Sequence, residues 1–590
     1  METSSTNQSQ FPPPKVKNIL VRYCHPSQRY GTRYLENLRL LKHFPKYYKN
    51  LSINITPQNS LLSRVKKIKK LNSFTGFLKE NEIISRTHWL SLFKSHQKEV
   101  DKLPKMELGL GRISLSDFRK LHIEEMKFFY NITKLSLPIM RMVEITSGKC
   151  ESFPRSIKHM RRLKRLEISL YRDNYEEMKG IVGKLDKMER LLTNFESLKL
   201  NVDDCSLDLQ DLFGNKRFMS HLTSLVFWSD FRQWSPFLGN IPHVCRNLRY
   251  LSISFRDFFS ETTEFMDFLS SIRDLPKLEG VNFRCKKNVE EFLKVFKPQA
   301  PLRYLELLLD FSGMDLTTMN FESKDLCKYK NLVQHWEDLH QLETLNLYLV
   351  CRSAQMMSFT RILVTMILKK APKLKSFECL ICIGENLDYT PSSYLPFFID
   401  QVPHLYESLE RFKVRFCDCY CLPRNVSFNL GALKVFKSLK KIKIKGEGLR
   451  FVKIKETISL LEKKKFAKLN LKGIAIDSKK DLKNILEGIS KAKRTESNNL
   501  KVKLEFQFNA KGEEIKYLNK FCHVIDSVKP IKGLLISLLL IECSEPTIQK
   551  MRAVIKRHPG IRNCILRLYS TMEGLEYHKV DGVEAEIRRV

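Results

Sequence analysis

The sequence has no apolar run long enough to cross a membrane. The longest one, Leu534 to Ile541, falls well short of the ~20 residues that a bilayer-spanning helix needs. The opening residues, Met1 to Pro14, are polar and contain no apolar core of the kind found in secretory signals. We therefore expect an intracellular protein with no transmembrane segment, cytoplasmic rather than nuclear, whose 15 cysteines are reduced.

Short motifs of nucleotide-binding and metal-dependent enzymes are also lacking. Gly109-Leu-Gly111 and Gly446-Glu-Gly448 lack the further glycines, or the Gly-Lys-Ser/Thr ending, of phosphate-binding loops, so we interpret both as turns. His335 and His340 are five residues apart, so they would not share a helix face as paired zinc ligands do. No nucleophile or base stands out. We predict that the chain is not an enzyme and binds no cofactor.

One dense group of thiols leaves a metal site open as an alternative. Cys417, Cys419 and Cys421 alternate along a short segment, and Cys379 and Cys382 lie upstream of it. These sulfurs would suffice for tetrahedral zinc. Cysteine also packs readily as a small apolar residue. We favour this packing role and predict no metal ligands.

Acidic residues are too few to balance the basic ones. The chain has 102 Lys and Arg against 65 Asp and Glu, a formal net charge of +37. A surface of this sign attracts acidic proteins, nucleic acid and anionic membranes. A general bias towards lysine would give the same excess, so the charge indicates the sign of a partner and not its class.

What the chain does have is a recurrent phrase with apolar residues at its first, fourth and sixth positions. At 590 residues it exceeds the ~250–300 at which a single core stops growing, so it holds several domains or one repeat array. Fifteen copies of the phrase begin between Ile132 and Ile561, 24 to 40 residues apart. The clearest copies begin at Leu163, Leu248, Leu302, Leu342 and Leu439. Stretches of helical period, such as Met178, Ile181 and Leu185, lie between copies.

A strand phrase followed by a helix cannot bury its own apolar faces, so each unit must stack on its neighbours. The phrase, its period of about 31 residues and the helical linkers resemble the leucine-rich-repeat family, specifically its intracellular ribonuclease-inhibitor-like branch. The family's ninth position, usually Asn or Cys, is Cys382 and Cys417 in two consecutive units. The resemblance implies an α/β fold: a curved leucine-rich-repeat solenoid (horseshoe) with a parallel concave sheet and convex helices.

We expect four segments along the chain. Residues 1–14 form a disordered tail and 15–105 hold degenerate N-terminal repeats or a cap with a helical insertion at about 60–102. Residues 106–575 form the leucine-rich-repeat solenoid, and 576–590 form a C-terminal tail. The insertion is too short for most enzyme domains, and an adaptor-binding motif such as an F-box within the N-terminal region is left open.

The repeat register predicts which side chains face solvent on the concave sheet. Since the fourth and sixth residues of each phrase point inward, the third, fifth and seventh point outward. In three consecutive units these positions are mostly cationic, which predicts a partner-binding patch of Arg411, Lys413, Arg415, Lys441, Lys443, Lys445, Lys468 and Lys472. Other units expose uncharged side chains, among which aromatic residues supply much interface energy, so we predict further partner contacts at Trp228, Tyr250 and Tyr348.

We interpret the chain as a non-catalytic protein-interaction scaffold or adaptor that binds an acidic protein through its concave face. The alternative is nucleic acid, RNA in particular, because lysines that contact phosphates would form the same patch. Single-stranded nucleic-acid sites interleave aromatics with Arg and Lys, and the outward positions of the patch hold no aromatic residue, which favours a protein. Simple solvation of the lysines is the remaining explanation. The oligomeric state is undetermined by the sequence.

Overall fold

The computed structural model describes strands along the whole chain and divides it into two compact units. The first unit comprises residues 1–230 and 235–248, and the second comprises residues 231–234 and 249–590. Side chains are described mainly within residues 162–170, 175–188, 194–202, 207–229, 236–255, 263–285, 289–296, 302–311, 339–351, 354–383, 402–416 and 430–445. Each unit is considered by itself below.

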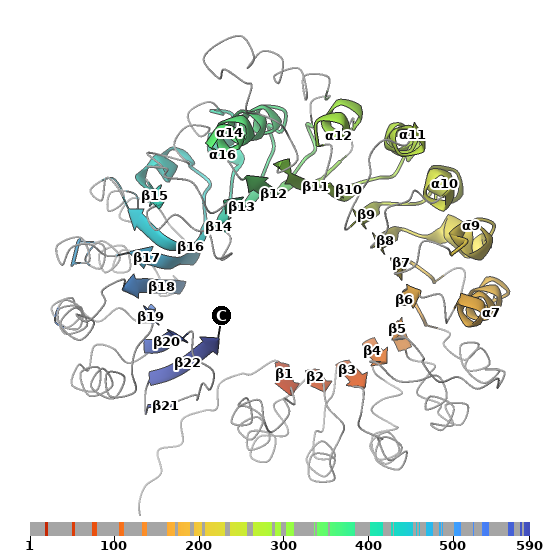
Figure 1. Ribbon diagram of the computed structural model, residues 1–590, viewed down its shortest axis with the longest axis horizontal. Coiled ribbons are helices and arrows are strands. Elements are labelled where there is room, and N and C mark those ends of the chain that lie inside the picture. The colour runs from red at the N-terminus through yellow and green to blue at the C-terminus, as the bar shows by residue number, and fades with distance from the viewer. Residues whose placement is uncertain are drawn as a thin grey trace, which may run out of the picture. The chain divides into compact units, whose positions relative to one another are not determined.

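The first unit is a parallel sheet in which each strand pairs with the next one in the chain. Its strands are β1 (Asn18–Val21), β2 (Asn50–Ile53), β3 (Ser73–Leu78), β4 (Lys105–Leu110), β5 (Ile132–Leu137), β6 (Arg165–Leu170), β7 (Ser197–Val202) and β8 (Ser224–Ser229). Helices α7 (Tyr175–Asp186), α9 (Leu209–Phe213) and α10 (Pro236–Val244) follow β6, β7 and β8 and lie on one side of the strands (Figure 1).

The second unit repeats the same arrangement. Its strands are β9 (Tyr250–Phe255), β10 (Gly280–Cys285), β11 (Tyr304–Asp310), β12 (Thr344–Cys351), β13 (Ser376–Ile383), β14 (Arg411–Phe416), β15 (Val426–Phe428), β16 (Lys441–Phe451), β17 (Lys468–Ala475), β18 (Lys501–Phe508), β19 (Leu534–Ile541), β20 (Cys564–Ser570), β21 (Lys579–Val580) and β22 (Val583–Arg589). Its helices are α11 (Thr263–Ser271), α12 (Val289–Val295), α14 (Ala354–Lys369) and α16 (Leu405–Ser408), with 3-10 turns η6 (Ile272–Asp274) and η8 (Leu430–Val435). Within this unit the strands from β9 to β14 follow an arc, with α11, α12 and α14 on its outer side (Figure 1).

Parallel pairing of consecutive strands requires a crossover connection after each strand, and helices supply several of these crossovers here. Pairing runs in chain order from β9 to β14, continues through β16 to β20, and ends on β22. A stack of strand and helix units in which each touches only its neighbours is a solenoid. The predicted α/β fold, a curved repeat solenoid with a parallel sheet, is confirmed.

The phrase positions account for the burial of each strand. In the phrase that begins at Leu302, the strand starts at the third position, Tyr304, and the fourth and sixth residues, Leu305 and Leu307, are fully buried. The helical stretch between repeats behaves in the same way, because Met178 on α7 is fully buried at the position that its helical period predicts. Within each unit, inward-facing apolar side chains of successive strands thus stack into a core.

Backbone hydrogen bonds hold neighbouring phrases in register. The carbonyl oxygen of Arg303, at the second position of its phrase, accepts hydrogen bonds from the N–H groups of Glu343 (2.9 Å) and Thr344 (3.0 Å) in the next phrase. The same doubly accepting carbonyl recurs at Glu279 and Glu343. Since these bonds involve only backbone atoms, any residue other than proline, which lacks the N–H donor, keeps them at the second position.

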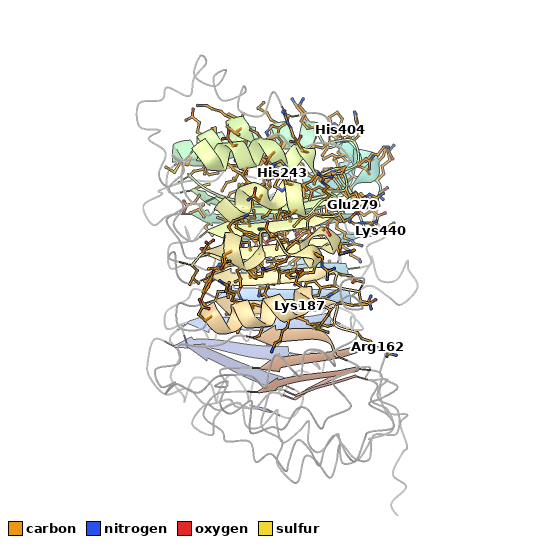
Figure 2. The ribbon with its side chains drawn as sticks, turned by 90° about the vertical axis from the view of Figure 1, so that its right-hand side faces the viewer. Arg162, Lys187, His243, Glu279, His404 and Lys440 are labelled. Atoms are coloured by element: carbon orange, nitrogen blue, oxygen red, sulfur yellow. The ribbon has the colours of Figure 1, made fainter. Side chains whose placement is uncertain are left out.

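Side chains at that second position nevertheless follow a rule in the second unit: their charges alternate in sign from repeat to repeat. The series is Arg249, Glu279, Arg303, Glu343, Lys375, Glu410 and Lys440. Ion pairs join Arg249 to Glu279 (3.7 Å), Lys375 to Glu343 (2.9 Å) and Lys440 to Glu410 (3.2 Å). Figure 2 shows Glu279 and Lys440 towards the same edge of the molecule. We call this series the charge ladder.

An aromatic cluster fills the core under β10 and α12. Phe283 of β10 packs edge-on against Phe292 and Phe296, with ring centroids 5.8 and 5.4 Å apart. Trp336, which precedes β12, packs edge-on against Phe296 at 5.7 Å, and its Nε1 donates a hydrogen bond to the carbonyl oxygen of Leu293 at 3.4 Å. The cluster therefore joins side chains of two successive repeats.

Several glycines occupy strands where the sequence predicts turns, and this prediction is wrong. Gly109 lies in β4, and Gly446 and Gly448 lie in β16. The pairing of β16 with β17 shifts register between Lys445 and Leu449, which brackets the two glycines. Glycine within a strand often marks such an irregularity, because the backbone there must bend away from the regular ladder.

Two further strands fall in segments that the sequence assigns to other structure. β3 lies within residues 60–102, where a helical insertion is expected, and it pairs with β2 and β4. β22 lies within residues 576–590, the expected C-terminal tail, and pairs in parallel with β20. The disordered tail expected at residues 1–14 lies outside the described residues. The boundaries of the four predicted segments stay predictions.

Candidate partner-binding face

In the second unit, the strand side chains that point away from the core and the helices form three rows across the sheet. We call these side chains outward, and the surface they form is the sheet face opposite the helices. Residues at the third phrase position make the first row, those at the fifth position the second row, and those at the seventh the third row. From β9 to β14 the first row is Tyr250, Gly280, Tyr304, Thr344, Ser376 and Arg411. The second row is Ser252, Asn282, Glu306, Asn346, Glu378 and Lys413. The third row is Ser254, Arg284, Leu308, Tyr348, Leu380 and Arg415.

The predicted basic patch occupies β14, β16 and β17 at the end of these rows. Arg411 lies opposite Lys441 and then Lys468, so cations follow one another across three strands in the first row. Arg411 and Lys441 are exposed, whereas Phe412 and Ile442 beside them are buried. In the other rows, Lys413 is followed by Lys443, and Arg415 by Lys445 and Lys472. The side chains of Lys468 and Lys472 lie outside the described residues.

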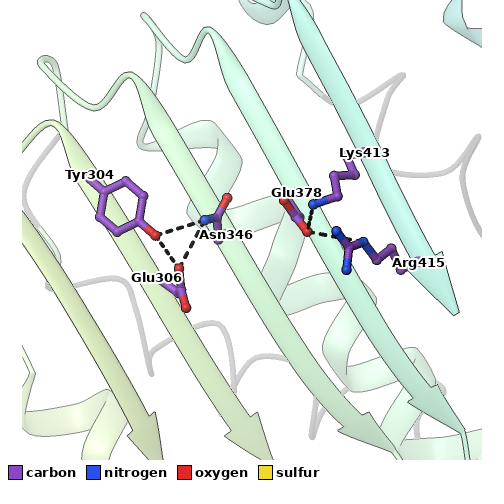
Figure 3. A network of polar contacts seen from close by, with 6 residues as sticks. All are labelled: Tyr304, Glu306, Asn346, Glu378, Lys413 and Arg415. Atoms are coloured by element: carbon purple, nitrogen blue, oxygen red, sulfur yellow. Dashed lines mark hydrogen bonds and ion pairs between the residues drawn. The ribbon is translucent and has the colours of Figure 1, made fainter. Parts of the chain in front are cut away.

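A carboxylate that the sequence analysis does not include lies beside the patch. Glu378 of β13 forms ion pairs with Lys413 and, at 3.5 Å, with Nε of Arg415 (Figure 3). Its side chain is 16% exposed, and those of Lys413 and Arg415 are 24% and 36% exposed, so solvent screens these contacts only in part. Glu378 therefore already offsets part of the positive charge on β14.

A second carboxylate, Glu306 of β11, is the centre of a hydrogen-bonded network on the same face. Asn282 Nδ2 donates to Glu306 Oε1 at 3.1 Å, and Asn346 Nδ2 donates to Oε2 at 3.1 Å. The hydroxyl of Tyr304 donates to Oε2 and accepts a hydrogen bond from Asn346 at 3.0 Å (Figure 3). Glu306 is only 8% exposed, so these three donors replace the water that a carboxylate requires.

Tyr250 and Tyr304 lie on either side of a glycine that gives them room. Their ring centroids are 6.0 Å apart, although the strand of Gly280 separates them. A Cβ atom on Gly280 would lie 2.8 Å from Cδ2 of Tyr250, so the Tyr250 ring covers the space that a side chain would otherwise fill. Burial raises the pKa of both tyrosines above the ordinary value, and the adjacent Glu306 raises it further.

The three predicted aromatic contacts lie on different units and rows. Trp228, which is 37% exposed, lies on β8 in the first unit, where it pairs in register with Asn201. Tyr250 and Tyr348 belong to the second unit but occupy different rows, on β9 and β12. Burial raises the pKa of Tyr348, and so do the charges of Glu306 and Glu378, while Arg415 and Arg284 lower it. Tyr348 therefore lies within electrostatic reach of both arginines.

The thiols considered as zinc ligands are divided between described and undescribed residues. Cys379 of β13 is buried in the core, Cys382 is half-buried, and both are free thiols. Cys417, Cys419 and Cys421 lie outside the described residues. Where the structure describes side chains, it contains no group of three His, Cys, Asp or Glu that could hold a metal ion. No helix within the same part of the chain is long and apolar enough to cross a bilayer.

Cys382 is expected to react with iodoacetamide before Cys245 and Cys351 in the native protein at pH 8. Burial raises the pKa of the Cys245 and Cys351 thiols to about 12, so almost no thiolate forms, and both side chains are fully enclosed. Mass spectrometry of peptides from briefly alkylated protein measures the order of modification. Equal rates at the three cysteines would show that the cores of both units open readily, since Cys245 lies in the first unit and Cys351 in the second. Alkylation in urea provides the control in which all three react.

Sequence analysis misses Glu378, Glu306 and Arg284 as members of this face. The signal was present, because the same outward positions in the phrases that begin at Leu278, Leu302 and Leu374 contain them. The sequence does not provide the geometry of their contacts, such as the ion pairs of Glu378 with both Lys413 and Arg415. No protein-family model and no curated protein matches the chain.

Proposed function

We propose that the chain is a non-catalytic binding scaffold that holds an acidic protein on the outward face of its second unit. The observation that carries this proposal is the register of the basic patch: cations occupy matching outward positions on β14, β16 and β17. Adjacent parallel strands are ~4.8 Å apart, so neighbouring cations in a row repel one another unless an anion lies against them. Carboxylates of a partner would supply that anion.

The proposal extends to the family and the compartment of the chain. The phrase, its period and the parallel sheet support a leucine-rich-repeat protein of the ribonuclease-inhibitor-like type. A solenoid of this kind has an extended sheet face available for binding. The free thiols at Cys245, Cys351, Cys379 and Cys382 support a location inside the cell, where thiols stay reduced. We propose the cytoplasm rather than the nucleus.

Glu378 refines the proposal by dividing the patch in two. On β14, Lys413 and Arg415 share this carboxylate. On β16, Lys441 is exposed, and the side chains of Lys443 and Lys445 are partly exposed. We therefore assign most of the binding of the acidic partner to the exposed cations, Arg411 on β14 and Lys441 on β16, since Lys413 and Arg415 already share a carboxylate.

Reversing the three β16 charges, Lys441→Glu with Lys443→Glu and Lys445→Glu, is expected to abolish recovery of the partner from native extract. A charge-matched control reverses Lys369, Lys373 and Lys434, which are exposed on α14, the turn after it and η8. Affinity purification with each variant, with and without nuclease, measures the loss. The control should recover as much partner as the unmodified protein does.

Other outcomes would contradict the proposal. Partner recovery that survives reversal of the β16 charges would place binding elsewhere on the chain. Recovery that disappears with nuclease would identify nucleic acid as the ligand, and its affinity would then fall steeply with salt because bound cations are released from phosphates. Loss of folding in the β16 variant, measured by circular dichroism, would refute the outward assignment of these lysines.

A further inference from the structure

The third row of the face has a composition that its neighbours lack. Leu308, Tyr348 and Leu380 occupy consecutive register positions on β11, β12 and β13, and all three are partly exposed on the outward side. Arg284 continues the row on β10, and Arg415 continues it on β14. An apolar strip across three strands is therefore bounded by an arginine at each end. We call these five side chains the bounded strip.

The residues next to the strip, along the same strands and in the second row, differ from it in burial or in polarity. Leu307 and Leu309, which flank Leu308 in sequence, point into the core and are buried. The second row beside the strip contains Glu306 and Glu378, whose carboxylates accept hydrogen bonds or ion pairs from the face itself. The apolar side chains of the strip thus lie between a row whose carboxylates are already paired and the partly exposed Asp310, Val350 and Cys382 at the next outward positions. Burial of the strip against an apolar ligand is favourable.

The two arginines have donors left for an anion. Arg284 is exposed at the β10 end. At the β14 end, Arg415 Nε is buried 3.5 Å from Glu378 Oε1, whereas the side chain as a whole is 36% exposed, so only its outer N–H groups can meet a ligand. Glu378 also pairs with Lys413, so one carboxylate serves two cations. A guanidinium has five N–H donors in a fork that matches a carboxylate, and a second carboxylate at each end would satisfy them.

We propose that the bounded strip is the docking site of one linear peptide segment with a short apolar centre and an acidic group at each end. This inference rests on the proposed scaffold function and specifies its partner. Arg284 and Arg415 are four strand spacings apart, or ~19 Å at ~4.8 Å per spacing. An extended peptide rises ~3.3 Å per residue, so acidic residues about six positions apart reach both arginines.

Lys445 extends the β14 end of the strip and makes the two ends unequal. It lies opposite Arg415 in the third row, so two cations meet the peptide at that end and one at the other. The peptide therefore binds in one preferred direction when its acidic groups differ in number. Tyr348 at the centre supplies the largest apolar surface of the strip, and aromatic residues near the middle of an interface contribute most to affinity.

The test uses fluorescent synthetic peptides and the full chain. The two-ended peptide has two acidic residues at each end of Leu-Ser-Phe-Ser-Leu, and the one-ended peptide has all four acidic residues at one end. Fluorescence anisotropy measures both affinities. Arg284→Glu is expected to weaken the two-ended peptide at least about tenfold and to leave the one-ended peptide unchanged, since only the former reaches both arginines.

Two further variants complete the design. Tyr348→Ala should weaken both peptides at least about tenfold, because both place their apolar centre over the strip. Arg273→Glu is the matched control, since Arg273 is an exposed arginine on η6 of the preceding repeat, and it should change neither affinity. Circular dichroism of each variant establishes that the fold is retained.

Three results would overturn the assignment: equal weakening of both peptides by Arg284→Glu, equal affinity for a peptide whose acidic residues are replaced by Gln, or displacement of the two-ended peptide by oligouridine. These outcomes are distinguishable from failure of the scaffold function. If the β16 reversal abolishes partner recovery but neither peptide binds, the scaffold function stands and the bounded strip is not its site. If that reversal leaves recovery unchanged, the scaffold function itself fails.

Discussion

Replacing Trp336 with alanine is expected to lower the free energy of unfolding by about 3–5 kcal/mol, the range for truncating a buried large aromatic residue. Trp336 is 1% exposed, its ring packs against Phe296, and its indole N–H donates to Leu293. Truncation leaves a cavity between consecutive repeats, which a stack of units cannot close without shifting its neighbours. Urea denaturation followed by circular dichroism measures the change.

The matched variant is Trp336→Phe, which retains an aromatic ring but loses the N–H donor and part of the volume. It should cost distinctly less than the alanine variant, because most of the contact with Phe296 is retained. If alanine and phenylalanine cost the same, the hydrogen bond to Leu293 would be the main contribution. An unchanged unfolding curve for the alanine variant would show that Trp336 does not join adjacent repeats.

Leu305→Ala is expected to lower the free energy of unfolding by about 2–5 kcal/mol, because Leu305 is fully buried at the fourth position of its phrase. The same chain offers a closely matched control. Leu308 lies on the same strand, β11, and has the same side chain, but it is partly exposed on the outward face. Leu308→Ala should cost about 1 kcal/mol or less.

The comparison of these two leucines tests the register of the repeat as well as its burial. A shift of one residue along β11 would exchange inward and outward positions. Equal losses from Leu305→Ala and Leu308→Ala, measured under identical conditions in urea, would therefore contradict the assignment of outward rows. A larger loss from Leu308→Ala would require the opposite face of the sheet to be the core.

Much of the fold can be predicted from the sequence because the phrase encodes burial directly. Leu163, Leu248 and Leu342 each precede a strand by two residues, and the spacing between phrases leaves room for a helix. The division into two units cannot be predicted in this way. The phrases at Leu222 and Leu248 are separated by an ordinary interval, so no feature of the spacing marks the boundary between units.

The face itself could be predicted in part. Outward positions follow from alternation along a strand, so Lys441, Lys443 and Arg411 were readable from the phrase alone. Contacts across strands depend on side-chain conformation, which alternation does not determine. Tyr250 leans over Gly280 towards Tyr304 only because glycine leaves room there, and Glu378 lies between two cations of the next strand.

The charge ladder also constrains how such a chain can change in length. Each of its ion pairs is solvent-exposed and contributes at most about 1 kcal/mol, and like charges at the same spacing cost a similar amount. Loss of the single repeat that carries Glu343 would bring Arg303 next to Lys375, whereas loss of two consecutive repeats would preserve the order of signs. Gain or loss of an even number of repeats in this unit therefore keeps opposite charges adjacent, whereas an odd number places like charges side by side. Residues at the edge of the sheet, which play no part in the core, set this preference.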